Sequence, residues 1–217
     1  KQIANRNEGV LTGKGISFGG SPGRTEATGY GAVYFAAEML ATKSDTLEAK
    51  TAVVSGSGNV ALYAVRKLIE EKVMVLTVSD RGGYLVKESG FTAEDIDVIE
   101  SEKKNRKSLA EISVTDTVYA EGRPWQEVKA QLYFPCATQN EIVEADAKAI
   151  IDHGALLVAE GANMPSNLGA LKIFREANVL FGPAKAVNAG GVAVSGLEMA
   201  QNASHLPWTA EVVDEKL

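Results

Sequence analysis

Short apolar runs alternate with longer amphipathic stretches along most of this chain. Buried strands are predicted from the runs at 51–55, 73–78, 131–135, 155–159 and 179–181. Apolar positions at three- and four-residue steps predict helices over 25–40, 59–71, 145–153 and 167–178. A charged surface helix is also predicted at 92–111. Such alternation is typical of a parallel sheet with helices on both faces. The pattern therefore predicts an α/β fold with a doubly wound, mostly parallel sheet.

A Gly-rich segment joins the first predicted strand to the helix that follows it. Its sequence, Gly56-Ser57-Gly58-Asn59-Val60-Ala61, matches the dinucleotide fingerprint in its Ala-terminated form. The first Gly allows a tight turn, and the second lets the backbone approach a pyrophosphate. The helix then directs its N-terminal amides and the positive end of its dipole at the phosphates. The motif alone is weak evidence, because a Gly-rich turn without a ligand also fits it.

The acid after the second predicted strand gives the fingerprint more weight. Asp80 lies 22 residues past Gly58, close to the spacing of about 20 expected of the acid that binds the ribose. We therefore expect a Rossmann-like dinucleotide-binding fold. Its phosphate cradle is expected at Gly56, Ser57, Gly58, Asn59 and Val60.

The neighbours of Asp80 bear on the choice of cofactor. An acid at this position normally takes the ribose hydroxyls of NAD and repels a 2′-phosphate. Ser79, however, can donate a hydrogen bond to phosphate, and Arg81 can pair with it as a fork. A solvated surface charge explains Arg81 about as well. We expect all three residues to contact the cofactor, with NADP as the cofactor and NAD as an alternative.

Composition and charge exclude several classes of protein. The net charge is -6 with scattered Lys and Arg, which argues against a nucleic-acid partner. No apolar run approaches the roughly 20 residues of a membrane span, and the single Cys136 suits a reducing compartment. We expect a cytoplasmic protein. The polar start at 1–6, without Met, leads us to expect a fragment of a longer protein.

Several segments together resemble glutamate dehydrogenase, most closely the bacterial-type hexameric NADP enzymes. The similarity covers essentially the whole chain and is strongest at 24–31, 55–61, 135–141, 159–165 and 188–202. That family converts glutamate to 2-oxoglutarate and ammonia, or runs the reverse reaction. The resemblance implies these substrates, and a homohexamer, for the full-length protein.

The resemblance also implies roles for individual residues at the cofactor. Thr28 and Asn59 match positions that hold the nicotinamide carboxamide and ribose, and Arg24 lies on the same cofactor-facing loop. Asn163 matches the Asn near the nicotinamide ribose, and Asn188 the Asn beside the ring. The segment of Ala137, Thr138 and Gln139 matches one that touches the cofactor. Without the resemblance, Asn163 and Asn188 are ordinary turn residues, and Thr28 caps or bonds within its helix.

The substrate site is implied at Ser195 and Val192. Ser195 matches the Ser that binds the side-chain carboxylate of glutamate; a small residue packed against a neighbouring helix is the alternative. Leucine and phenylalanine dehydrogenases share the fingerprint and the turn at 188–191, but they need an apolar group where Ser195 stands. Ser195 therefore favours glutamate.

We expect three segments: a linker at 1–24, an NAD(P)-binding domain at 25–187, and a segment at 188–217 that returns toward a substrate domain. The family carries its catalytic Lys and Asp in that N-terminal domain, and no part of this chain matches it. We therefore expect no catalytic residue and no metal site here, and cofactor binding without turnover. A nucleotide-sensing module without chemistry is the alternative from another class.

Overall fold

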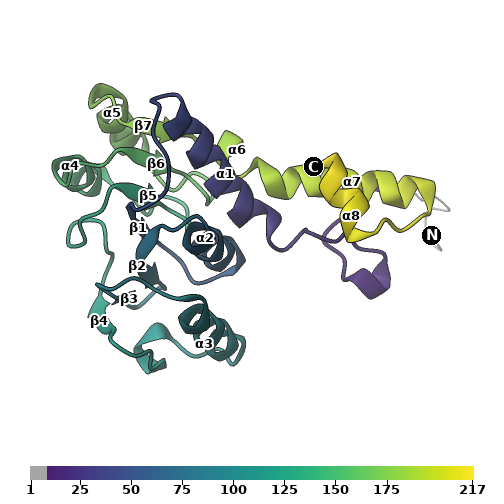
Figure 1. The fold of residues 1–217 in the computed structure, drawn as a ribbon, viewed down its shortest axis with the longest axis horizontal. Helices are drawn as coiled ribbons and strands as arrows, with labels where there is room; N and C mark the ends of the chain where they lie inside the picture. The colour runs from purple at the N-terminus through teal and green to yellow at the C-terminus, as the bar shows by residue number, and fades with distance from the viewer. Residues whose placement is uncertain (1–8) are drawn as a thin grey trace.

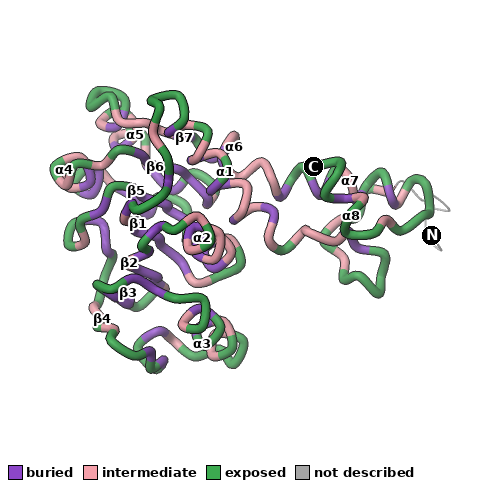
Figure 2. The backbone as a smooth tube through the Cα atoms, viewed as in Figure 1, coloured by how far each residue is buried: buried purple, intermediate pink, exposed green. Residues whose placement is uncertain are grey.

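A broad α/β body and a narrow arm make up the molecule (Figure 1). The computed structural model describes residues 9–217, so the polar start at 1–6 lies outside the described residues. The arm is formed by α7, Ala189–Ser204, and α8, Ala210–Lys216, with the segment that precedes α1 alongside. The body carries most of the buried residues (Figure 2).

The body is built on a seven-stranded sheet with the order β4-β3-β2-β1-β5-β6-β7. Five strands are parallel neighbours: β1 Thr51–Val54, β2 Met74–Ser79, β5 Leu132–Phe134, β6 Leu157–Ala159 and β7 Leu180–Gly182. Two strands at one edge pair antiparallel: β3 Gly83–Val86 and β4 Val118–Glu121. The predicted Rossmann-like, mostly parallel fold is confirmed.

Helices cover both faces of the sheet. One apolar cluster joins the sheet to α1 Ala27–Ala41, α2 Asn59–Glu70 and α3 Ala93–Lys104. A second cluster joins the other face to α4 Glu144–Asp152 and α5 Leu168–Glu176. Successive residues of β1 belong to opposite clusters, because side chains alternate along a strand. The short α6, Ala184–Val187, leads into the arm.

Two local predictions need correction. The antiparallel strands β3 and β4 were not expected, so β5 is the fifth strand along the chain. The charged helix at 92–111 is shorter than predicted: α3 ends at Lys104, Arg106 takes a φ of 63°, and a 3-10 turn follows at Leu109–Glu111. A left-handed residue cannot continue an α-helix, and a new capping box at Ser108 starts the next turn.

Among residues 9–217, no helix is long and apolar enough to cross a membrane. The same residues contain no group of His, Cys, Asp and Glu side chains arranged to hold a metal ion.

Candidate functional site

Two adjoining clefts open beyond the carboxyl ends of β1 and β5. From β1 the chain proceeds to β2 on one side, and β5 later pairs on the other, so strand order reverses between β1 and β5. Open α/β sheets bind ligands at such a point. The two clefts have volumes of about 1040 and 810 Å³ and share five lining residues: Asn59, Val60, Cys136, Ala137 and Thr138.

The larger cleft, called here the basic cleft, collects the predicted phosphate cradle and the residues around Asp80. Its lining includes Gly56, Ser57, Gly58, Ser79, Asp80 and Arg81. The smaller one, called the amide cleft, collects the residues assigned to the nicotinamide and the substrate: Arg24, Thr28, Gln139, Asn163, Asn188, Val192 and Ser195. Every residue predicted for the site thus lines one of the two clefts, and the roles stay predictions.

The Gly-rich turn has the geometry that a phosphate cradle needs. Gly56 has a φ of 92°, and a Cβ there would lie 3.0 Å from the carbonyl oxygen of Cys136. Its N–H donates to the Ser79 hydroxyl oxygen at 2.8 Å, which ties the turn to the end of β2. Gly58 is the N-cap of α2, and a Cβ there would meet no atom within 4 Å. The start of α2 therefore faces open space in the basic cleft.

Asp80 is engaged by the chain itself. Its carboxylate accepts from the Leu109 N–H at 2.8 Å, the Lys103 ammonium at 3.0 Å and the Gly82 N–H at 3.0 Å. Burial opposes ionisation, but these donors outweigh it and hold the pKa of Asp80 below its usual range. The carboxylate thus fixes the loop after β2, and Lys103 neutralises the charge that would repel a 2′-phosphate.

Four cations of the basic cleft were not predicted: Lys103, Arg106, Lys107 and Arg123. Lys107 pairs with Glu102 at 2.5 Å, whereas Arg81 and Arg106 make no ion pair with another residue of 9–217. The available signal was the dense run of cations at 103–107, which we interpreted as a solvated helix face. Two unpaired guanidinium groups at one cleft suit a phosphate, which they can bind as a fork.

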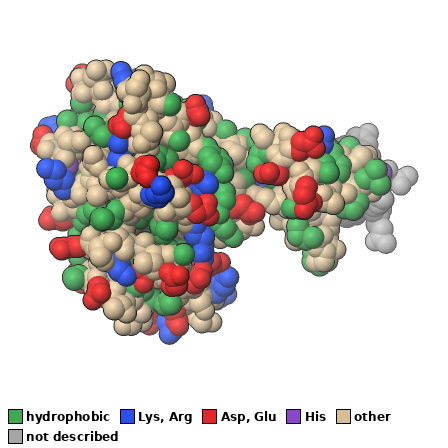
Figure 3. Space-filling model, viewed as in Figure 1, with side chains coloured by type: hydrophobic (Ala, Val, Ile, Leu, Met, Phe, Trp, Pro, Cys, Tyr) green, Lys and Arg blue, Asp and Glu red, His purple; other side chains and the backbone are tan. Residues whose placement is uncertain are grey.

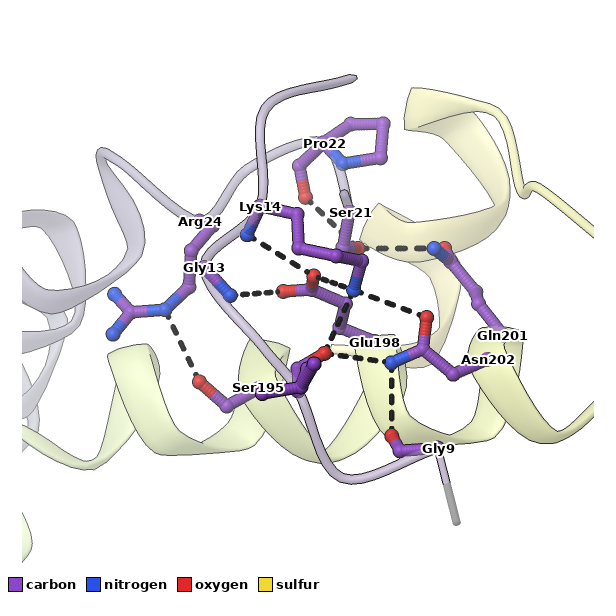
Figure 4. Close-up of polar contacts among 11 residues, drawn as sticks. Gly9, Gly13, Lys14, Ser21, Pro22, Arg24, Ser195, Glu198, Gln201 and Asn202 are labelled. Atoms are coloured by element: carbon purple, nitrogen blue, oxygen red, sulfur yellow. Dashed lines mark hydrogen bonds and ion pairs between the residues drawn. The ribbon is translucent and has the colours of Figure 1, made fainter. Parts of the chain in front are cut away.

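The amide cleft brings distant side chains into contact. The Asn188 amide donates to Asn163 Oδ1 at 2.8 Å. Arg24 Nε donates to the Ser195 hydroxyl oxygen at 3.1 Å (Figure 4). That hydroxyl donates to the Gly191 carbonyl at 3.0 Å. Ser195 is buried, while Arg24 stands half-exposed. Arg24, assigned to the cofactor side, thus directly contacts the predicted substrate residue.

The start of α7 packs closely against α1, and this crossing shapes the amide cleft. A Cβ at Gly190 would overlap the carbonyl oxygen of Ala27, and one at Gly191 would overlap the Thr28 hydroxyl. Two glycines therefore let the helices approach until Thr28 lies beside the first turn of α7. Val192 projects outward with 70% of its surface exposed. It is available for contact with a ligand.

A buried carboxylate on α7 holds the N-terminal strap, the name used here for residues 9–24. Glu198, fully buried, accepts from the Gly13 N–H at 2.7 Å and from the Lys14 ammonium at 2.5 Å (Figure 4). Asn202, one turn further, donates to the carbonyls of Gly9 and Leu11. These contacts position the strap that delivers Arg24 to Ser195, and sequence reasoning missed them.

Replacing Glu198 with Gln is expected to lower the free energy of unfolding at neutral pH by about 1–3 kcal/mol, because the Lys14 ammonium loses a charged, buried acceptor. Burial opposes ionisation of Glu198, but Lys14 and the two strap N–H groups outweigh it and lower its pKa below the usual 4.5. Because the pKa of Glu198 is lower in the folded chain than in the unfolded chain, its ionised carboxylate adds to the free energy of unfolding. This contribution is fully present above pH 4.5 and is lost as the pH falls below it.

The measurement is urea unfolding of the unaltered chain and of Glu198→Gln, from pH 7 down to the lowest pH at which both are still folded. The difference between them is expected to shrink below about pH 4.5. The exposed Glu215→Gln variant is the control and is expected to change stability by less than about 0.5 kcal/mol. A difference that stays constant through the acid range would contradict the assigned ion pair.

Two more buried carboxylates hold the loops of the amide cleft. Glu160, at the end of β6, accepts from the Ser166 N–H at 3.2 Å and the Ala184 N–H at 2.9 Å, joining its loop to the start of α6. Glu141 plays the same part in the loop after β5. Neither carboxylate was predicted to act in this way.

The fingerprint turn lies at the start of α2, and the clefts lie where strand order reverses. These two features define the chain as a Rossmann-like α/β protein with a dinucleotide fingerprint. A family model described as "Glutamate/Leucine/Phenylalanine/Valine dehydrogenase" matches residues 19–217. The chain belongs to this family.

Curated relatives match over the entire chain. It is 49% identical to an NAD(P)-specific glutamate dehydrogenase of Xylanibacter ruminicola and 50% identical to an NADP-specific one of Haemophilus influenzae. It covers 49% of each of these relatives, so it spans about half the length of the curated relatives it matches. A solved glutamate dehydrogenase of Plasmodium falciparum superposes with a TM-score of 0.93 at 47% identity, covering all of this chain and 47% of that one.

Proposed function

We propose that this chain is the cofactor-binding domain of an NADP-dependent glutamate dehydrogenase, which converts L-glutamate, NADP and water to 2-oxoglutarate, ammonia and NADPH, reversibly. One observation carries the proposal: a cleft adjoins a cleft of amides and hydroxyls at the reversal of strand order, and it holds two guanidinium groups, Arg81 and Arg106, that make no ion pair within residues 9–217. The names of the relatives support both the reaction and the cofactor.

The residues of the two clefts fit a phosphorylated dinucleotide. The N-terminus of α2 is suited to the pyrophosphate, and Arg81 and Arg106 are suited to the 2′-phosphate. Amide and hydroxyl groups of Asn163, Asn188 and Thr28 can both donate and accept, as a neutral carboxamide requires. When bound, the cofactor supplies the hydride chemistry; the chain orients it and excludes water.

Ser195 and Arg24 make an acidic side chain the better substrate. A hydroxyl held against a guanidinium suits a carboxylate, whereas an aliphatic side chain would displace water from both polar groups and form no hydrogen bond with either. This contact favours glutamate over the leucine or phenylalanine expected of the runner-up enzymes. Val192 lies on the same cleft and is assigned to the substrate with them.

We further propose the division into a linker at 1–24, a cofactor domain at 25–187 and a returning segment at 188–217. The catalytic Lys and Asp are assigned to the substrate domain of the longer protein, which turns over only when the cleft between domains closes. A homohexamer and a cytoplasmic location stay predictions. A module that binds nucleotide without chemistry has no particular contact in its favour.

Titration calorimetry of the chain with NADP and with NAD tests the cofactor assignment. Arg81→Ala is expected to weaken NADP binding about tenfold to a hundredfold, because a charge-assisted bond to the 2′-phosphate is lost, and to leave NAD binding unchanged. Arg175→Ala removes an exposed guanidinium from α5 and serves as the control. Equal loss for both cofactors would remove the phosphate role of Arg81. No binding of either dinucleotide would overturn the proposed function.

A further inference from the structure

The loop after β5 is held from beneath by one buried carboxylate. Glu141 is 6% exposed. Its Oε1 accepts from the N–H groups of Ala137 and Thr138 at 3.0 and 3.3 Å. These two N–H groups point into the protein and are not free to bind a phosphate. The carboxylate therefore determines which groups the loop presents on its outer side.

Ser55 links this carboxylate to the other half of the sheet. Its hydroxyl oxygen accepts from the Cys136 N–H at 2.9 Å, and its hydroxyl acts on the Glu141 carboxylate by lowering its pKa. Ser55 follows β1 and Cys136 follows β5, so the pair joins the two strand ends between which strand order reverses. Arg123 adds a bond to the Glu141 backbone carbonyl.

The loop held in this way forms part of both clefts. Ala137 and Thr138 line the basic cleft as well as the amide cleft, and Gln139 lines the amide cleft. All three are exposed, so contacts to their neighbours on the outer side do not fix them. Without Glu141, two inward N–H groups would lack an acceptor, and the loop would turn to find one.

We propose that Glu141 is a positioning residue that holds loop 137–139 against Ser55 and so sets the affinity for the nicotinamide half of the cofactor. The inference rests on the proposed function and assigns a residue that the fingerprint does not include. Burial raises the pKa of Glu141, while the Ser55 hydroxyl and the two loop N–H groups act in the opposite direction. The carboxylate is thus retained in an environment that disfavours its charge.

The test compares a whole dinucleotide with one end of it. NADPH spans both clefts, whereas adenosine 2′-monophosphate reaches only the basic cleft near Arg81. Glu141→Ala is expected to weaken NADPH binding tenfold or more, by roughly the effect of an unsatisfied buried group. The same variant is expected to change the affinity for adenosine 2′-monophosphate by less than about twofold. Glu141→Gln keeps an oxygen for the two loop N–H groups and is expected to restore most of the loss.

Two further variants guard against a general loss of structure. Asp95, like Glu141, accepts a backbone N–H; it also accepts from a Lys ammonium, and it lines neither cleft. Asp95→Ala therefore controls for destabilisation. Ser55→Ala removes the Ser55 hydroxyl but keeps the Glu141 carboxylate, and it is expected to weaken NADPH binding about fivefold. This variant still tests the proposal if Glu141→Ala does not fold.

The outcomes separate the inference from the proposed function. If the unaltered chain binds neither NADPH nor adenosine 2′-monophosphate, the proposed function fails. If it binds both, but Glu141→Ala and Ser55→Ala bind NADPH as tightly, the positioning role alone is wrong. Equal weakening of both ligands in Glu141→Ala, matched by Asp95→Ala, would also overturn it, because that result reports only a looser fold.

Discussion

Replacing Gly58 with Val is expected to weaken NADPH binding by at least about a hundredfold while the fold stays intact. Gly58 has a φ of -92°, which any residue can adopt, and a Cβ there would meet no atom of the chain within 4 Å. The open space lies in front of the first amides of α2, where a phosphate must approach to about 3 Å to accept their hydrogen bonds. An isopropyl group would occupy it.

Calorimetry with NADPH measures the affinity of Gly58→Val, and thermal unfolding of the same sample measures its stability. Gly56→Ala is the informative comparison, because Gly56 has a φ of 92° and its Cβ would press on Cys136 and Ala61 at 3.0 and 3.1 Å. That variant is expected to lose stability as well as affinity. Unchanged NADPH affinity in Gly58→Val would place the phosphates elsewhere.

Replacing Gly29 with Val is expected to lower the free energy of unfolding by about 3 kcal/mol, at the upper end of overpacking effects. A Cβ at Gly29 would lie 2.6 Å from the Ala64 nitrogen, 2.7 Å from the Val60 carbonyl oxygen and 2.8 Å from Tyr63 Cβ. Two of these neighbours are backbone atoms of α2, which cannot turn aside. Helices α1 and α2 would have to separate, and α2 begins at the phosphate turn.

Urea unfolding at neutral pH gives the measurement. Gly196→Ala is the matched control: the position lies inside α7, a Cβ there meets nothing within 4 Å, and alanine favours a helix. It is expected to raise the free energy of unfolding by about 0.5–1 kcal/mol. A Gly29→Val protein that unfolds within about 1 kcal/mol of the unaltered chain would show that α1 and α2 can separate at little cost.

The parallel core of the fold was predictable because its strands are short and apolar and, except for β2, each is followed by a helix. The edge strands β3 and β4 were not. Strand β3 starts at a Gly whose added Cβ would overlap Ala120, so its close pairing depends on a partner more than thirty residues away. The end of α3 depends on the left-handed Arg106, a conformation that the sequence of a charged run does not signal.

The placement of the Gly-rich turn after β1 and of Asp80 after β2 was predictable because their spacing is local. Other contacts of the clefts arise only in the folded chain. Lys14 meets Glu198 across 184 positions, and Cys136 meets Ser55 across 81. The sequence around a charge run or a single Glu does not indicate which distant residue it will contact. The contacts of Lys103, Glu141 and Glu198 were therefore not predicted. Arg24 lines the amide cleft with the other residues predicted for it, but its contact with Ser195 was not foreseen.

The arm leaves the body where Gly190 crosses α1. If the arm tilts about this crossing, residues of α7 move further the farther they lie from it. With a rise of about 1.5 Å per residue, Ser195 stands roughly 8 Å along α7 from that crossing. Asn188 precedes it. A small tilt of the arm would therefore carry Ser195 away while Asn188 and its partner Asn163 barely move. Since Glu198 ties the strap to the same helix, Arg24 would follow Ser195. The Arg24–Ser195 contact, proposed for an acidic side chain, would thus move independently of the Asn163–Asn188 pair, proposed for the amide end of the cofactor.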